Sequence, residues 1–301
     1  MTPAAPLCLP PRPVGPPPTV RPLPPGTCDT HMHVFGPAER YPLAAGRNYT
    51  PQPVGLDDYL PVMETLGIDR AVLVQPSVYG TDNSALLEAL ARMPERLRAV
   101  VVVPPDVPDT ELVALHEAGV RGVRVNRRNP GGLALEDVGT LARRIAPLGW
   151  HIQLQIELAR GPDLASLARH CPVPLVIDHF GLLDPRWPVA PGPFADLLRL
   201  MEGGAFWLKL SAPYRISAAG CPYAELMPFV SALTTHRPDR LLWASDWPHS
   251  EMWSDIPDDI ELAGALGLPQ LPAAVRRQIL IDNPAGLYGF EPPGAGLPSG
   301  G

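Results

Sequence analysis

The sequence predicts an α/β fold, a (β/α)8 barrel preceded by a proline-rich arm. Two observations support this prediction. Eight apolar or β-branched segments alternate with helical segments, and the alternating stretch is roughly 250 residues long, as is typical of such barrels. A doubly wound open sheet is the alternative, but no glycine-rich phosphate loop follows the first strand, so the barrel is favoured.

Apolar and β-branched runs mark the expected strands. They lie at residues 27–36, 70–77, 99–104, 120–126, 150–157, 174–179, 206–211 and 240–246. The helical stretches that separate and follow them lie at residues 57–66, 84–93, 109–118, 135–148, 162–170, 194–202, 223–234 and 273–282. Helix-start signals support two of these, Pro108-Asp109 and Gly161-Pro162-Asp163.

The composition limits the classes of function. The 301 residues are enough for one large domain with a sizeable core, and 46% apolar with 18% charged residues is typical of a soluble globular protein. A net charge of −7 argues against a nucleic-acid partner, which needs a basic face. An anionic small substrate stays open, because a local arginine cluster can override the global sign.

The expected location is cytoplasmic. The four cysteines (Cys8, Cys28, Cys171 and Cys221) are scattered and form no Cys-x-x-Cys pair, which is typical of reduced thiols. No apolar run approaches the roughly 18 residues that a membrane span needs. The N-terminus lacks the basic start and apolar core of a signal peptide, so we expect no membrane partner.

Composition also divides the chain into three parts. Residues 1–26 are a proline-rich arm with few large apolar side chains, which favours polyproline II, so we expect it to be loosely held. The alternatives are that it docks onto a neighbouring surface or binds a proline-reading module. Residues 27–290 form the barrel domain, and residues 291–301 a flexible tail. The oligomeric state stays open.

A His-x-His pair lies in the first strand. Side chains alternate between the faces of a strand, so His31 and His33 point the same way and Met32 points the opposite way. Two imidazoles at the end of a strand can hold a metal ion or polarise a carbonyl group.

Other polar residues fall at the ends of the later strands, where a barrel carries its chemistry. On the fifth strand, alternation predicts that His151, Gln153, Gln155 and Glu157 face the barrel interior. The remaining polar residues at strand ends are Gln75 and Ser77, Arg124 and Asn126, Asp178 and His179, Lys209 and Ser211, Tyr214 and Arg215, and Asp246 with His249.

These motifs resemble the amidohydrolase superfamily. The marks are His-x-His after strand one, His179 after strand six, Ser-Asp-Trp-Pro-His at residues 245–249, and the closing segment at residues 282–290. Within the superfamily the chain most resembles the 2-pyrone-4,6-dicarboxylate lactonase group and related sugar-acid lactonases and lactone isomerases. That resemblance is carried by residues 29–37, 41–42, 47–51, 74–80, 122–124, 178–181 and 209–215.

Departures from the family pattern affect the metal site. A binuclear member has a bridging Lys or Glu after strand four and a His after strand five, but strand four offers Arg124 and Asn126, and the sole lysine, Lys209, lies on strand seven. The lactonase group is a metal-independent branch, so the resemblance implies no required cofactor. The alternative is one divalent ion, Zn or Mn, held by His31, His33, His179 and Asp246.

The expected catalytic roles follow from lactone chemistry. Asp246 is the expected general base for water, and His31, His33 and His179 would stabilise the developing oxyanion. Arg124 and Arg215 are expected to clamp a substrate carboxylate, because a guanidinium offers paired donors. Further expected substrate contacts are Tyr49, Ser77, Arg127, Arg128 and Gln155, which stands where the lactonase group has a tyrosine. Lys209 is either a buried pocket cation or paired to a carboxylate such as Glu157.

The predicted function is hydrolysis of a carboxylate-bearing lactone, as in the degradation of aromatic compounds. The alternatives are an aldarolactone isomerase, a mononuclear metal-dependent amidohydrolase or decarboxylase, and a catalytically dead barrel that binds dicarboxylates.

Overall fold

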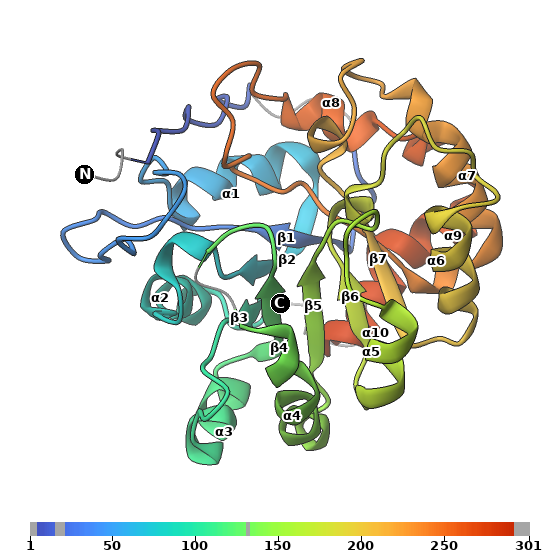
Figure 1. Ribbon diagram of the computed structural model, residues 1–301. Coiled ribbons are helices and arrows are strands. Elements are labelled where there is room, and N and C mark those ends of the chain that lie inside the picture. Colours follow the sequence, from blue (N-terminus) through green and yellow to red (C-terminus); the bar gives the residue numbers. More distant parts are fainter. Residues whose placement is uncertain (1–4, 16–21, 131–132, 292–301) are drawn as a thin grey trace, which may run out of the picture.

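The computed structural model describes residues 5–15, 22–130 and 133–291, and it confirms the predicted barrel (Figure 1). Eight parallel strands follow one another in chain order around one sheet. The strands are β1 (Thr27–Met32), β2 (Ile68–Val74), β3 (Leu97–Val101), β4 (Val120–Asn126), β5 (His151–Gln155), β6 (Leu175–Ile177), β7 (Phe206–Leu210) and β8 (Leu241–Trp243). Predictions for residues 1–4, 16–21 and 292–301 lie outside the described residues.

The first and last strands meet through polar contacts that follow the strand ends. The Thr30 hydroxyl donates to the Trp243 carbonyl at 2.8 Å, the His33 amide donates to Trp247 O at 2.8 Å, and the Asp246 amide donates to His31 O at 3.0 Å. Asp29 accepts the Ser245 amide at 3.0 Å. These bonds hold the His-x-His segment against the segment that carries Asp246.

Ten α-helices occur in the described part of the chain. They are α1 (Leu56–Leu66), α2 (Ser84–Arg92), α3 (Asp109–Glu117), α4 (Leu135–Ile145), α5 (Leu164–His170), α6 (Pro193–Glu202), α7 (Met227–His236), α8 (Asp259–Gly264), α9 (Ala273–Arg277) and α10 (Asn283–Tyr288). Among the described residues, none of the helices has both the length and the hydropathy needed to cross a membrane.

Two expected helices differ from the structure. The helix expected over residues 223–234 begins at Met227, with a proline in its first turn, after a 3₁₀ turn at Ala224–Leu226. The helix expected over residues 273–282 is α9 followed by a π turn at Gln278–Asp282, so its last residues pack differently.

Strand β5 illustrates how the sequence pattern positions the site. Ile152 and Leu154 are buried in the main apolar core, while His151, Gln153 and Gln155 are buried on the other face, as alternation predicts. The prediction for Glu157 was wrong. The strand ends at Gln155 and the chain turns, with the Arg160 amide bonded to Glu157 O at 3.1 Å, so Glu157 is exposed.

Residues 5–9 contact two loops at the C-terminal ends of the strands. Leu7 forms a bridge with Thr50, and the Leu9 amide donates to Met252 O at 3.0 Å. Cys8 is buried, and its Sγ accepts the Glu251 amide at 3.3 Å. This part of the arm is therefore hydrogen-bonded to the domain, in contrast to the loosely held arm that its composition predicts.

Candidate active site

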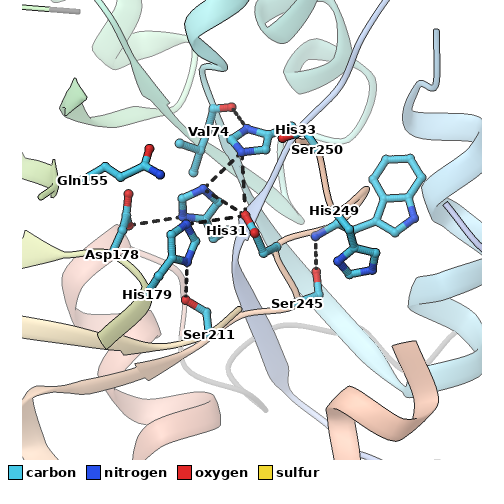
Figure 2. Close-up of polar contacts among 12 residues, drawn as sticks. His31, His33, Val74, Gln155, Asp178, His179, Ser211, Ser245, His249 and Ser250 are labelled. Carbon is cyan, nitrogen blue, oxygen red and sulfur yellow. Dashed lines mark hydrogen bonds and ion pairs between the residues drawn. The ribbon is translucent and has the colours of Figure 1, made fainter. Parts of the chain in front are cut away.

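Three imidazoles and one carboxylate converge at the C-terminal ends of the strands (Figure 2). Asp246 Oδ1 lies 3.6 Å from His179 Nε2, 3.7 Å from His31 Nε2 and 3.9 Å from His33 Nε2. The two Nε2 atoms of the His-x-His pair are 3.3 Å apart. All four side chains are buried. The structure thus brings together the four residues expected to be catalytic, from three different strand ends.

The remaining ring nitrogen of each imidazole has a partner. His33 Nδ1 donates to the Val74 carbonyl at 2.6 Å, which leaves its Nε2 lone pair facing Asp246. His179 Nδ1 lies 2.9 Å from Ser211 Oγ, and His31 Nδ1 lies 3.2 Å from Asp178 Oδ1 (Figure 2). These contacts fix the ring orientations, so each Nε2 points towards the same small volume.

The backbone at two of these residues is strained. His179 has φ 52° and Asp246 has φ 63°, and both lie in the left-handed region that non-glycine residues rarely adopt. Such strain costs about 1–3 kcal/mol per residue and persists only where the surroundings hold it. At Asp246 the amide bond to His31 O provides such support.

The second oxygen of Asp246 is saturated with donors. Oδ2 accepts the Tyr214 hydroxyl at 2.7 Å and Arg215 Nε at 2.8 Å, and Arg215 Nη2 lies 2.8 Å away. Burial opposes ionisation of this carboxyl, but Arg215 and the three imidazoles together outweigh it and hold the pKa of Asp246 well below its usual range. Asp246 is therefore an anion whose Oδ1 faces the imidazoles.

The three histidines are neutral at neutral pH. Burial lowers the pKa of His33 to about 3, with Arg124 adding to the effect, and lowers the pKa of His179 to about 4. Burial and Lys209 also hold the pKa of His31 well below its usual range. Neutral imidazoles can donate one hydrogen bond or offer one lone pair to a ligand.

A buried ion pair supports His31 from inside the barrel. Lys209 Nζ lies 3.4 Å from Asp178 Oδ1 and 3.3 Å from His31 Nδ1, and it donates to Gln153 Oε1 at 2.8 Å. Lys209 is buried and also pairs with a carboxylate, but its partner is Asp178 and not Glu157, which is exposed. Burial lowers the pKa of Lys209 to about 8.

The residues expected to contact the substrate form two groups, an inner group of buried residues and an outer group of exposed ones. The inner Arg124 is buried. It donates to Gln75 O at 2.9 Å and to Gln155 Oε1 at 2.7 Å, while its Nε has no partner among the described residues. Tyr49 and Ser77 are also buried, and burial raises the pKa of Tyr49. The outer Arg127 and Arg128 are exposed.

An open cleft lies beside Arg215 at the mouth of the site. Its volume is about 860 Å³, and Arg128, Glu157 and Arg186 also line it. A neighbouring hollow of about 390 Å³ is lined by Arg127, Arg128 and Arg160. Glu251 lies between the arginines, 3.7 Å from Arg215 Nη1 and 3.8 Å from Arg128 Nε. The 860 Å³ cleft is therefore lined by three guanidinium groups and by the carboxyl groups of Glu157, Asp184 and Glu225.

Three of the converging residues, His31, His33 and Asp246, also fit a divalent metal ion. They offer ligand atoms that all lie within 4.8 Å of one another. The separations of 3.3–3.9 Å between donor atoms are close to the ~3.3 Å expected around a tetrahedral Zn²⁺ with bonds of about 2.0–2.1 Å. The ring contacts to Asp178 and Val74 O are of the kind that support metal-binding histidines.

No role was expected for Asp178 or Tyr214, and both make direct contacts in the site. Asp178 contacts His31 and Lys209, and Tyr214 donates to Asp246. Their signal was present in the sequence, since each lies beside an expected residue at a strand end. Alternation within one strand could not assign them, because their partners come from other strands.

Comparisons of the sequence place these observations among known proteins. A family model described as Amidohydrolase matches residues 28–290. The chain is 39% identical over 272 residues to a 4-sulfomuconolactone hydrolase of Rhizobium radiobacter, covering 89% of this chain and 91% of the relative. It is 35% identical over 277 residues to a 2-pyrone-4,6-dicarboxylate hydrolase of Comamonas testosteroni, covering 88% and 91%. It is 30% identical over 279 residues to a D-galactarolactone isomerase of Agrobacterium fabrum, covering 90% and 93%.

A solved structure agrees with the fold. The crystal structure of a putative 2-pyrone-4,6-dicarboxylic acid hydrolase from Pseudomonas putida superposes with a TM-score of 0.77 and 35% identity, covering 89% of this chain and 99% of that chain.

Proposed function

The chain belongs to the Amidohydrolase family, as its motifs predicted, and we propose that it is a lactonase that opens the ring of a carboxylate-bearing lactone. The relatives named as lactone hydrolases support this class of reaction. The observation that carries the proposal is the ionised Asp246, whose Oδ1 faces three neutral imidazoles while its Oδ2 is held by Arg215 and Tyr214.

In the proposed reaction Asp246 Oδ1 removes a proton from a water molecule, and the water oxygen attacks the lactone carbonyl carbon. The carbonyl oxygen takes up negative charge, which Nε2–H groups of His31 and His179 would stabilise. His33 cannot donate from Nε2, because its proton lies on Nδ1, bonded to the Val74 carbonyl. The ring C–O bond then breaks, and the proton on Asp246 is transferred to the leaving oxygen. The products are a carboxylate and an alcohol or enol, and the second proton of the attacking water is released to solvent.

The tautomer of His31 depends on which of its two neighbours, Lys209 or Asp178, is bonded to Nδ1. Lys209 Nζ at 3.3 Å can donate to His31 Nδ1, which places the proton on Nε2 for the substrate carbonyl. Alternatively Nδ1–H donates to Asp178 at 3.2 Å, which leaves an Nε2 lone pair for a metal ion. The Asp178–Lys209 pair can therefore stabilise either tautomer of His31, the one that donates to a substrate carbonyl or the one that binds a metal ion.

The arginines support an anionic substrate. Arg124 Nε has no partner among the described residues. Arg215 lines an open cleft, although its Nε and Nη2 already lie 2.8 Å from Asp246 Oδ2. Paired guanidinium donors match the two oxygens of a carboxylate. Tyr49, Ser77, Gln155, Arg127 and Arg128 are proposed as further contacts, and the identity of the lactone depends on them.

We propose that the reaction requires no metal ion. The alternative is a reaction that depends on one divalent ion bound at the same site. If an ion binds, His31, His33, His179 and Asp246 would hold it, and it would supply Lewis-acid polarisation of the lactone carbonyl. A cytoplasmic location is also proposed. The four cysteines are all free thiols, and three of them are buried.

The test is turnover of 2-pyrone-4,6-dicarboxylate and 4-sulfomuconolactone by metal-stripped protein with added EDTA. Undiminished hydrolysis supports a metal-free lactonase. Hydrolysis that returns only with Zn²⁺ or Mn²⁺ makes the four residues ligands. Absence of turnover across a wider panel of lactones, with and without metal, would overturn the proposal.

A second candidate is isomerisation of an aldarolactone, in which the ester moves between hydroxyl groups. The relative named D-galactarolactone isomerase, at 30% identity, favours it. Nuclear magnetic resonance of the product separates the two, because a ring-shifted lactone would appear in place of an open acid.

A further inference from the structure

Asp246 is held by a chain of hydrogen bonds that the proposed reaction does not use directly. Tyr214 donates to Asp246 Oδ2 at 2.7 Å, and His249 Nδ1 lies 3.1 Å from the same hydroxyl. On its far side His249 Nε2 lies 3.1 Å from Asp259 Oδ1. His249 and Asp259 are buried, so this chain is shielded from water.

We propose that Tyr214, His249 and Asp259 are positioning residues that keep Asp246 Oδ1, and not Oδ2, directed at the imidazoles. The inference rests on the proposed function, because it takes Asp246 as the general base.

The geometry of Arg215 shows why a positioning device is needed. A guanidinium fork matches a carboxylate by placing one N–H on each oxygen. Here Arg215 Nε and Nη2 both lie 2.8 Å from Oδ2, so the fork engages one oxygen only. Without a further restraint, the Asp246 side chain can rotate to give Arg215 both oxygens. That rotation would turn Oδ1 away from the histidines.

The Tyr214 hydroxyl supplies the restraint. It adds a third donor to Oδ2, which favours the orientation seen here. His249 fixes the phenol in turn, because its ring meets the Tyr214 ring edge-on, with centroids 5.4 Å apart and an interplanar angle of 87°. Asp259 is the first residue of α8, so the chain ties the site to a helix.

The backbone between Asp246 and His249 also helps to orient the Asp246 side chain. His249 has φ 62°, in the left-handed region, and its amide donates to Asp246 O at 2.9 Å. The turn from Asp246 to His249 is therefore tight, and a His249 ring anchored by Asp259 stabilises the strained conformation that presents Asp246. Tyr214 and Asp259, which lie 35 and 10 residues from His249, are thus linked through His249 to the turn that carries the Asp246 carboxylate.

The test begins with Tyr214→Phe, which removes the hydroxyl and little else. We expect kcat for the lactone to fall about 10- to 100-fold, since small misplacements of a catalytic group have effects of this size, while KM changes less than about threefold. Tyr223→Phe is the matched control. Tyr223 is buried and lines the same 460 Å³ cavity as the partly buried Tyr214, and we expect the kcat of Tyr223→Phe to match that of the unaltered protein.

A double-mutant cycle distinguishes positioning through Tyr214 from a general packing role. His249→Asn should lower kcat on its own and add almost nothing in the Tyr214→Phe background, because its effect passes through the hydroxyl. Asp259→Asn, which keeps an oxygen for His249 Nε2, should retain more activity than Asp259→Leu. Independent, additive losses in the cycle would overturn the inference.

A crystal structure of Tyr214→Phe tests the same inference without activity. We expect both Asp246 oxygens to contact Arg215 and Oδ1 to move away from His179 Nε2. An Asp246 side chain oriented as in the unaltered protein would overturn the inference, whatever the kinetics show. Absence of lactone turnover in the unaltered protein would instead overturn the proposed function, and the crystal structure would still decide the positioning role.

Discussion

Two ends of the barrel interior contain buried histidines, and they differ in what surrounds the rings. At the C-terminal ends of the strands, the Nδ1 atoms of His31, His33 and His179 lie against Asp178, Val74 O and Ser211. At the other end, His151 opens β5 and packs edge-on against the Tyr288 ring, with centroids 5.2 Å apart. Neither ring nitrogen of His151 has a hydrogen-bond partner among the described residues.

Burial and protonation do not separate these two regions. Burial lowers the pKa of both His33 and His151 to about 3, so each imidazole is neutral at neutral pH. What separates them is orientation. Partners on one ring nitrogen direct the other towards a shared volume, which happens only at the C-terminal end. A buried histidine therefore indicates a functional site only when a partner on one ring nitrogen directs the other nitrogen towards a volume shared with other polar groups.

The largest expected effect comes from Asp246→Asn, which removes the base but keeps the shape of the side chain. We expect lactone turnover to fall about 10²- to 10⁴-fold, while the ligand still binds. Steady-state kinetics measure the turnover, and calorimetric titration with the lactone measures the binding. If turnover stays within about tenfold of that of the unaltered protein, the cluster of Asp246 and the three histidines is not catalytic.

Asp178→Asn should have the next largest effect, on stability as well as activity. It leaves the buried Lys209 ammonium without its carboxylate, and breaking a buried pair in this way costs about 3–5 kcal/mol of unfolding free energy. Urea denaturation measures the loss. The control is the double variant Asp178→Asn/Lys209→Met, which removes both charges and should recover much of the stability. Equal losses in the single and double variants would contradict this account.

Glu251→Gln should change substrate preference by a smaller factor. The Glu251 carboxylate lies 3.7 Å from Arg215 Nη1 and 3.8 Å from Arg128 Nε, so it competes with a substrate anion for both. Removing its charge should lower KM for a dianionic lactone about 2- to 5-fold, the size of a partly exposed ion pair. The effect should shrink in high salt. Ratios of kcat/KM for a dianionic and a monoanionic lactone provide the measurement.

The smallest expected effect on turnover is that of His151→Phe, within about twofold. Its effect should appear in the dependence of stability on pH. The pKa of His151 is about 3 when folded against 6.5 for a free histidine, so between these values only the unfolded chain binds the proton. The free energy of unfolding therefore falls as the pH drops through this window.

Removing that imidazole should make the acid-induced loss of stability shallower, as urea denaturation between pH 6.5 and pH 4 would show. A turnover loss of tenfold or more would place His151 in the catalytic machinery and remove the contrast between the two ends.

The sequence by itself determined the order of the elements and the direction of many side chains. The alternation of apolar and polar residues gave β4 its observed bounds, Val120–Asn126, and put Gln153 and Gln155 opposite Ile152 and Leu154. These features are local, because a strand places successive side chains on opposite faces whatever it pairs with. The family motifs likewise identified the four residues that converge at the mouth.

Only the tertiary structure decided where the strands stop and which polar groups pair. Strands β6 and β8 are shorter than predicted because the chain bends before His179 and Asp246, which take left-handed conformations that neighbouring strands support. His31 and Asp178 are 147 residues apart, and Tyr214, His249 and Asp259 come from separate segments. Such contacts form when the barrel closes, since closure brings strand ends together that no local pattern relates.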